Sequence, residues 1–229
     1  TTQVQMVTTV GAANVSKCMT NIKTNEVLPT AQALMRYGGK EKVVRIALDS
    51  LAQKSFVTRA IVEELGIKEN KTNDTLEIHG FGGNVTTSAA STATFELLSK
   101  QDGASVTIEG AYICEDRICS PFEAVNIDIE MYPHLKGIML ADPFPRERAE
   151  IDVLLGIRHF HAIVKGDVRR ALKLMEEPTA MNTVFGYVVS GPYISREGGE
   201  KCIGMHIKVK VRKEEELDKK LEKFWEVES

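Results

Sequence analysis

The sequence predicts a mainly β fold, and three features of its residue pattern support this prediction. Short runs rich in Val, Ile and Thr recur along the chain, and Gly or Pro separates many of them. Helical periodicity is confined to one short segment in the first third of the chain and to its last residues. With 229 residues, of which 43% are hydrophobic, the chain is long enough to bury a substantial core.

A β-hairpin is expected just before the most informative stretch of the chain. Residues 27–35 form an apolar run, Gly38-Gly39 supplies a turn, and residues 42–48 form the next strand. This second strand runs directly into Asp49. Because the neighbours of an acid at the end of a buried strand can set its pKa, Asp49 is the first candidate for a catalytic residue.

A short helix is expected after this acid. Apolar residues recur at helical spacing between Phe56 and Leu65. Ser55 is of the residue type that caps the start of a helix, and Gly66 is a suitable residue to end it. The sequence therefore predicts a helix that begins at about Ser55 and ends at Gly66.

The middle of the chain is predicted to be β. Residues 75–79 and 84–87 flank Gly80-Phe81-Gly82-Gly83, which indicates a hairpin whose glycine-rich tip is mobile and presents one aromatic side chain. Further strands are expected at residues 92–97 and 105–113, where the strand-favouring residues Thr, Val, Ile, Phe and Tyr recur.

The rest of the chain is predicted to contain a connection, three strands and a helix. Residues 132–143 are expected to form a proline-bounded connection with apolar anchors, and residues 151–156 a fully buried strand closed by glycine. Residues 182–191 are predicted as one strand with an internal glycine. A strand at 207–211 and an amphipathic helix at 214–227 complete the prediction.

Charge and hydropathy argue against several classes of function. The formal net charge is -3 and no basic patch is evident before the C-terminal tail, so neither a nucleic-acid nor a membrane-surface partner is expected. No apolar run approaches the roughly 20 residues of a membrane-spanning helix. The polar start of the chain does not resemble a signal peptide, so an intracellular, cytoplasmic location is expected.

No metal or cofactor is predicted. The four cysteines form no CxxC pair, and reduced thiols are expected in a reducing compartment. Cys114, Cys119 and His134 have a spacing that is poor for a metal site. His159 and His161 would share a face on a strand but not on a helix, and they are expected to be solvated or packed rather than bound to a metal.

Taken in order, the motifs of the chain resemble the retropepsin-type aspartic proteases, and most closely the protease region of BEL/Pao retrotransposon polyproteins. The family has an active-site run of the type Ala-Leu-Leu-Asp-Ser-Gly, and this chain has Ala47-Leu48-Asp49-Ser50-Leu51. The other matching segments, which extend from Val27 almost to the end of the chain, are Leu28-Pro29-Thr30-Ala31, Gln53-Lys54-Ser55-Phe56, Gly80-Phe81-Gly82-Gly83, Pro133-His134-Leu135-Lys136-Gly137, Leu140-Ala141-Asp142-Pro143, Ile151-Asp152-Val153-Leu154-Leu155-Gly156, residues 182–191 and Lys223-Phe224-Trp225-Glu226.

The resemblance implies a specific architecture. The expected fold is a retropepsin-like closed barrel, half of an aspartic protease, with a short helix after the active-site loop and a C-terminal extension of a strand and a helix. The implied domain boundaries are an N-terminal strand-rich extension at 1–26, a retropepsin-like core at 27–165, and a C-terminal extension at 166–229 that packs on the core.

The resemblance also implies roles for individual residues. Each subunit of a homodimer would contribute Asp49 to the hydrolysis of a peptide bond, and Ser50 would form hydrogen bonds across the dimer axis. Gly80, Phe81, Gly82 and Gly83 would form the flap over an extended peptide. Leu154, Leu155 and Gly156 would form a buried strand beneath the active-site loops. The partners are thus a second copy and a peptide or protein, without a cofactor.

Leu51 departs from the family signature, which has glycine at this position. Glycine permits backbone angles that are costly for other residues, and it leaves room beside the carboxylates, so Leu51 is expected to add backbone strain and bulk. Two functions stay open for this reason. One is an aspartic endopeptidase from a retrotransposon polyprotein or a domesticated host copy. The other is an inactive pseudoprotease that serves as a homodimerisation and protein-protein interaction module. A β domain that shares only the fold is disfavoured by the number of matching segments.

Overall fold

The structure is a computed structural model that describes residues 24–79, 85–173, 176–194 and 208–212. Its fold is mainly β, in agreement with the sequence prediction. The described strands are β1 (Thr24–Val27), β2 (Thr30–Tyr37), β3 (Lys40–Leu48), β4 (Phe56–Thr58), β5 (Glu69–His79), β6 (Val85–Leu98), β7 (Ser105–Cys114), β8 (Val153–Leu155), β9 (Val164–Arg169), β10 (Thr179–Thr183), β11 (Gly186–Ile194) and β12 (Lys208–Arg212). The described helices are α2 (Arg59–Leu65) and α3 (Ile157–Ile163), with 3-10 turns η2 (Ile129–Met131) and η3 (Pro133–Leu135).

Six of the described strands close into a barrel. They follow one another in the order β6-β2-β3-β8-β4-β7, and β7 pairs back to β6. β3 and β8 are parallel, with Ile46 opposite Val153 and Leu48 opposite Leu155. Because parallel strands point the same way, the loop after β3 and the loop after β8 lie at the same end of the barrel. Asp49 therefore lies next to the residues that follow Leu155.

The hairpin predicted before Asp49 is confirmed. β2 and β3 pair antiparallel from Thr30 opposite Ala47 to Tyr37 opposite Lys40. Gly38 and Gly39 make the turn with φ of 55° and 83°, a conformation that favours glycine over residues with a β-carbon.

The predicted helix after Asp49 begins later than expected. Phe56 and Val57 are buried, and they belong to β4, which pairs with both β7 and β8. α2 starts only at Arg59, so the expected cap at Ser55 is wrong. The expected end is confirmed, because Gly66 adopts a left-handed φ of 69° and its N–H donates to the carbonyl of Glu63. Pairing within the barrel therefore overrides the helical periodicity of the first residues.

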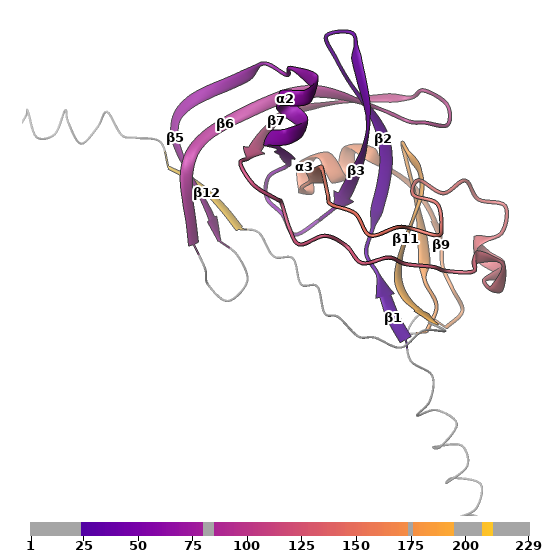
Figure 1. The fold of residues 1–229 in the computed structure, drawn as a ribbon. Coiled ribbons are helices and arrows are strands. Elements are labelled where there is room, and N and C mark those ends of the chain that lie inside the picture. Colours follow the sequence, from indigo (N-terminus) through magenta and orange to yellow (C-terminus); the bar gives the residue numbers. More distant parts are fainter. Residues whose placement is uncertain (1–23, 80–84, 174–175, 195–207, 213–229) are drawn as a thin grey trace, which may run out of the picture.

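β5 and β6 form a long antiparallel arm that extends from the barrel, with β12 beside β5 (Figure 1). β12 confirms the strand predicted at 207–211. The helix expected at 214–227 lies outside the described residues, as does most of the extension expected at 1–26.

A second sheet has the strand order β1-β11-β10-β9. The single strand predicted at 182–191 is wrong, because β10 ends at Thr183 and β11 begins at Gly186, whose φ is 107°. The Thr183 hydroxyl accepts from the Phe185 N–H at 3.1 Å and donates to the Gly186 carbonyl at 2.7 Å, which fixes the turn between them. The expected boundaries at 26/27 and 165/166 fall inside β1 and β9.

Helices contribute little to the described fold. α2 and α3 have seven residues each, and the predicted connection at 132–143 contains η3 and is anchored by the buried side chains of Tyr132 and Leu135. In the described ranges, no helix has the length and apolar character that a bilayer span requires.

Candidate active-site loop

The Asp49 carboxylate is held by the backbone of its own loop. Its Oδ1 accepts hydrogen bonds from the N–H groups of Leu51 and Ala52, at 2.8 and 3.3 Å. Such side chain-to-backbone bonds fix the orientation of a carboxylate at a turn. The other oxygen, Oδ2, is buried, and among the described residues it has no hydrogen-bond partner. A buried carboxylate oxygen without a partner is costly in an isolated chain, so this atom is a candidate contact for a water, a substrate or a second subunit.

The segment that follows β8 holds this loop in place. The Asp49 N–H donates to the Leu155 carbonyl at 3.0 Å, and the Ile157 N–H donates to the Ala52 carbonyl at 2.8 Å. A third bond joins the Gly156 N–H to the Ser55 Oγ at 3.0 Å. The loop that carries Asp49 is therefore anchored to residues that lie far from it in the sequence.

Leu154, Leu155 and Gly156 lie where the sequence places a buried strand under the loop. Both leucines are fully buried. A β-carbon built on Gly156 would lie 2.4 Å from the Lys54 carbonyl oxygen and 2.7 Å from that of Ala52. The φ of Gly156 is −76°, so glycine is needed here for space and not for its backbone angles.

Ser50 and Leu51 form the exposed tip of the loop. The Leu51 side chain is 69% exposed, and no described residue other than glycine has a positive φ. The backbone strain that the sequence predicted for Leu51 is thus absent from this structure. What remains is an apolar side chain in solvent two residues after the candidate acid, where a partner surface or a peptide can cover it.

Ser55 and His159 form a buried pair that the sequence did not reveal. The Ser55 Oγ lies 2.7 Å from Nδ1 of His159, and the two side chains are only 5% and 9% exposed. Both histidines lie on α3, where His159 is buried and His161 is exposed, so one is packed and the other solvated. A Ser–His pair can indicate a nucleophile with its base. Here the serine oxygen accepts from Gly156 and is shielded from solvent, so its role is structural.

The remaining predicted site residues do not extend this cluster. Gly80, Phe81, Gly82 and Gly83 lie outside the described residues, although β5 and β6, which lead to them, are described. Burial raises the pKa of Cys119 to about 11 and also raises the pKa of Cys114, which disfavours the thiolate forms that bind metals. Across the described ranges, no group of three His, Cys, Asp or Glu side chains could hold a metal ion.

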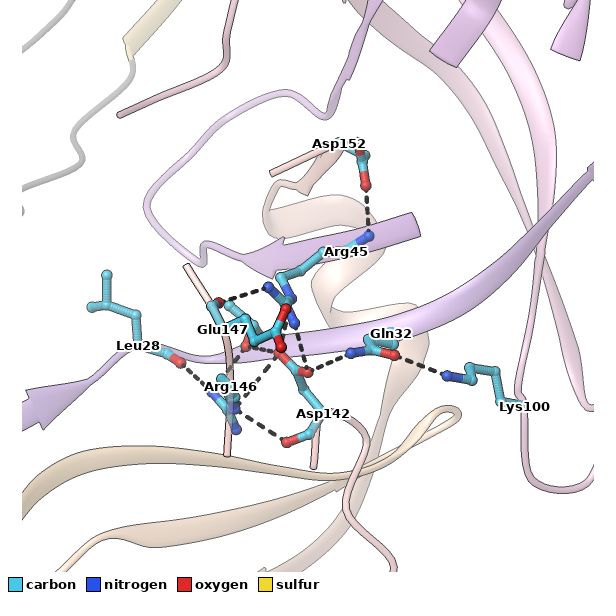
Figure 2. A network of polar contacts seen from close by, with 9 residues as sticks. Leu28, Gln32, Arg45, Lys100, Asp142, Arg146, Glu147 and Asp152 are labelled. Carbon is cyan, nitrogen blue, oxygen red and sulfur yellow. Dashed lines mark hydrogen bonds and ion pairs between the residues drawn. The ribbon is translucent and has the colours of Figure 1, made fainter. Parts of the chain in front are cut away.

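A buried polar network centred on Asp142 supports the β2–β3 hairpin, and sequence reasoning did not predict it. Figure 2 shows Asp142 between Arg146, Gln32 and Arg45. Its carboxylate accepts from the Thr30 hydroxyl at 2.6 Å and from the Gln32 amide at 2.9 Å. Nε of Arg45 and Nε of Arg146 lie 3.3 and 3.6 Å from its Oδ2. The network therefore joins the loop after η3 to both strands of the hairpin.

Arg146 is the most constrained member of this network. Burial lowers its pKa to about 10, so the guanidinium stays charged at neutral pH. It lies 4.2 Å from the ring centroid of Phe144, and it donates to the Leu28 carbonyl and to the Thr30 hydroxyl. Leu28 lies just before β2 and Thr30 is its first residue, so the network holds the start of this barrel strand.

One hollow in the described surface lies apart from Asp49. It has a volume of about 620 Å³, and its lining residues are Asn126, Ile127, Asp128, Ile129, Leu140, Pro143 and Phe144. None of these residues belongs to the Asp49 loop. This hollow is therefore not the cleft in which a peptide would reach Asp49.

The chain was compared with protein-family models, with curated proteins and with solved structures, and none of these comparisons finds a match. The motifs of this chain and the geometry of its Asp49 loop are the features that bear on its function.

Proposed function

We propose that this chain is an aspartic endopeptidase of the retropepsin type that acts as a homodimer. The observation that carries the proposal is the Asp49 carboxylate, which follows a barrel strand, is oriented by two loop amides, and keeps one buried oxygen without a partner among the described residues. The closed barrel and the buried strand beneath the loop support the same assignment.

In the proposed dimer, two Asp49 carboxyl groups face each other across a twofold axis. At such a distance both cannot remain ionised, so they share one proton. The ionised carboxylate takes a proton from a water as that water attacks the peptide carbonyl, and the protonated carboxyl donates a hydrogen bond to the carbonyl oxygen. Ser50 of each chain ties the two loops together, and the segment Gly80–Gly83 covers the peptide.

A second function is favoured by one specific observation, the exposed Leu51 side chain at the tip of the loop. In this alternative the dimer is a pseudoprotease, and Leu51 fills the space that a substrate needs between the two carboxylates. The retained cleft then serves to bind a partner protein, for instance by adding an extended segment of that partner as a strand.

Cleavage of a diverse peptide library, assayed from about pH 4, near the ordinary pKa of an aspartate, to about pH 7, separates the two functions. The endopeptidase predicts cleavage by the native chain and its loss on Asp49→Asn, a change that keeps the Oδ1 acceptor but removes the ionised form. It also predicts inhibition by a statine-type mimic of the transition state. If the native dimer cleaves nothing and Leu51→Gly restores cleavage, the pseudoprotease is the correct function.

A further inference from the structure

The structure links the Asp49 loop to a titratable side chain on α3. Ser55, at the end of the loop, has an oxygen that accepts the Gly156 N–H at 3.0 Å and lies 2.7 Å from Nδ1 of His159. The Ser55 carbonyl accepts a further bond from the Tyr112 N–H at 2.8 Å. Neither the proposed chemistry nor the sequence motifs assign a role to this histidine.

Whether Nδ1 of His159 carries a proton decides which way the Ser55 hydroxyl points. A serine hydroxyl has one proton to donate and two lone pairs that accept. When Nδ1 is an acceptor, the Ser55 proton is donated to it while the oxygen accepts from Gly156, and every group in the chain of bonds is paired. When Nδ1 carries a proton, both neighbours of the Ser55 oxygen are donors, and the hydroxyl proton loses its acceptor in a buried place.

We propose that His159 is a positioning residue that makes the geometry of the Asp49 loop dependent on pH. In its neutral form it accepts from Ser55 and completes the link from α3 to the loop, and its protonation removes that acceptor. The inference deepens the proposed function, since it names a regulator of the same site, and its effect on catalysis rests on that proposed function.

The surroundings of His159 favour the neutral ring. Burial lowers the pKa of His159 below its ordinary value of 6.5. Of the charged groups that act on it, Arg158 on its own helix also lowers the pKa, and Glu109 on β7 raises it. A histidine held neutral by folding is protonated more readily in the unfolded chain, so its contribution to stability is complete above pH 6.5 and is lost as the pH falls toward its folded pKa.

The test is an NMR titration of the full-length chain, which needs no catalytic activity. In the native protein at pH 7, the NMR signals of the His159 ring nitrogens should show that Nδ1 carries no proton and therefore acts as the acceptor. The amide signals of Leu51, Ala52 and Gly156 should then move with the His159 midpoint, below pH 6.5. The variant His159→Asn places an amide oxygen near the position of Nδ1 and cannot titrate, so this component of the amide shifts should disappear. The matched control is His161→Asn, at an exposed position of α3, which should leave the pH-dependent shifts of the loop amides unchanged.

A second variant covers the case in which His159→Asn does not fold. Glu109→Gln removes an exposed acid that favours the protonated ring, so it should lower the His159 midpoint, and the loop amides should follow it to the same lower pH. Loop amides whose midpoint stays fixed while that of His159 moves would overturn the inference, as would a proton on Nδ1 at neutral pH. Absence of peptide cleavage would count against the endopeptidase alone and leave this result intact.

Discussion

The Asp142 side chain is completely buried, and it is the carboxylate on which two arginines of the described structure converge. Asp142 matters for stability because its removal would leave Arg45 and Arg146 without the carboxylate that balances their charge. Arg146 is 6% exposed, and a buried charge that loses its counter-ion is far more costly than the pair is favourable. Figure 2 shows how closely these groups surround the carboxylate.

We therefore expect Asp142→Ala to destabilise the protein by about 3–5 kcal/mol, a range typical of breaking a buried ion pair from one side. Urea unfolding followed by circular dichroism measures this difference. The matched control is Glu41→Ala, which removes the partner of Arg36 in a pair whose side chains are 41% and 46% exposed, and which should cost less than about 1 kcal/mol. A loss of similar size in both variants would contradict this account of the network.

At the same scale, the sequence locates Asp49 but not the residues that hold it. The acid is recognisable because an apolar strand ends at it. Ser55 has the same local pattern as a helix cap, and only its contact with Gly156 and His159 shows its role. The prediction of backbone strain at Leu51 is wrong, because φ at this residue is negative. A family signature gives residue types and does not reveal this backbone angle.

At the scale of elements, β8 and the start of α3 support the Asp49 loop. Three hydrogen bonds join this segment to the loop. Their donors are the backbone N–H groups of Asp49, Gly156 and Ile157. The carbonyl oxygens of Lys54 and Ala52, in the loop, lie so near Gly156 that no side chain fits there.

Gly156→Ala should therefore displace the loop and destabilise the fold by about 1–3 kcal/mol, as expected for overpacking. Thermal unfolding measures the effect, and any proteolytic activity should fall further than the fraction of unfolded protein explains. Gly137→Ala is the control, because nothing lies within 4 Å of a β-carbon there and only the left-handed φ of 70° is strained, at about 1–2 kcal/mol. A Gly156→Ala protein with native stability and an unchanged loop would contradict the role given to this glycine.

The elements that the sequence predicts well are those with a local signal. The β2–β3 hairpin has a Gly-Gly turn between two apolar runs, and β12 follows β-branched alternation. The β10–β11 hairpin was missed because its turn is fixed by the Thr183 hydroxyl and a buried Phe185. The start of α2 was missed because β4 gains more from pairing in the barrel than from continuing the helix.

At the scale of the whole molecule, the closed barrel restricts how two copies can associate. Each of the six ring strands pairs with a neighbour along part of both edges. Among the described strands, β1, β9 and β12 are the terminal strands of their sheets, so their outer edges are places where a second copy can add a strand. The resemblance to retropepsins predicts that such a dimer exists, but the sequence does not contain a local pattern that identifies its interface.

Sedimentation equilibrium of the purified chain should give twice the mass of one chain at micromolar concentration. An Asp49→Asn protein should associate to the same extent, because its loop bonds are preserved. A strict monomer over the whole accessible range of concentration would contradict both the endopeptidase and the pseudoprotease. A dimer of the native chain that dissociates on Leu51→Gly would show that the exposed leucine contacts the second copy.

The parallel pairing of β3 with β8 has a consequence for how the chain folds. β8 contributes only Val153–Leu155, yet without it the ring between β3 and β4 stays open. Ile46 meets Val153 only after the long intervening stretch of chain has been ordered, so this contact has a high sequence separation. Topologies dominated by such contacts fold slowly. During synthesis the barrel therefore stays open until a strand of three residues near the end of the core has been made, and until then its uncompleted edges are exposed to aggregation.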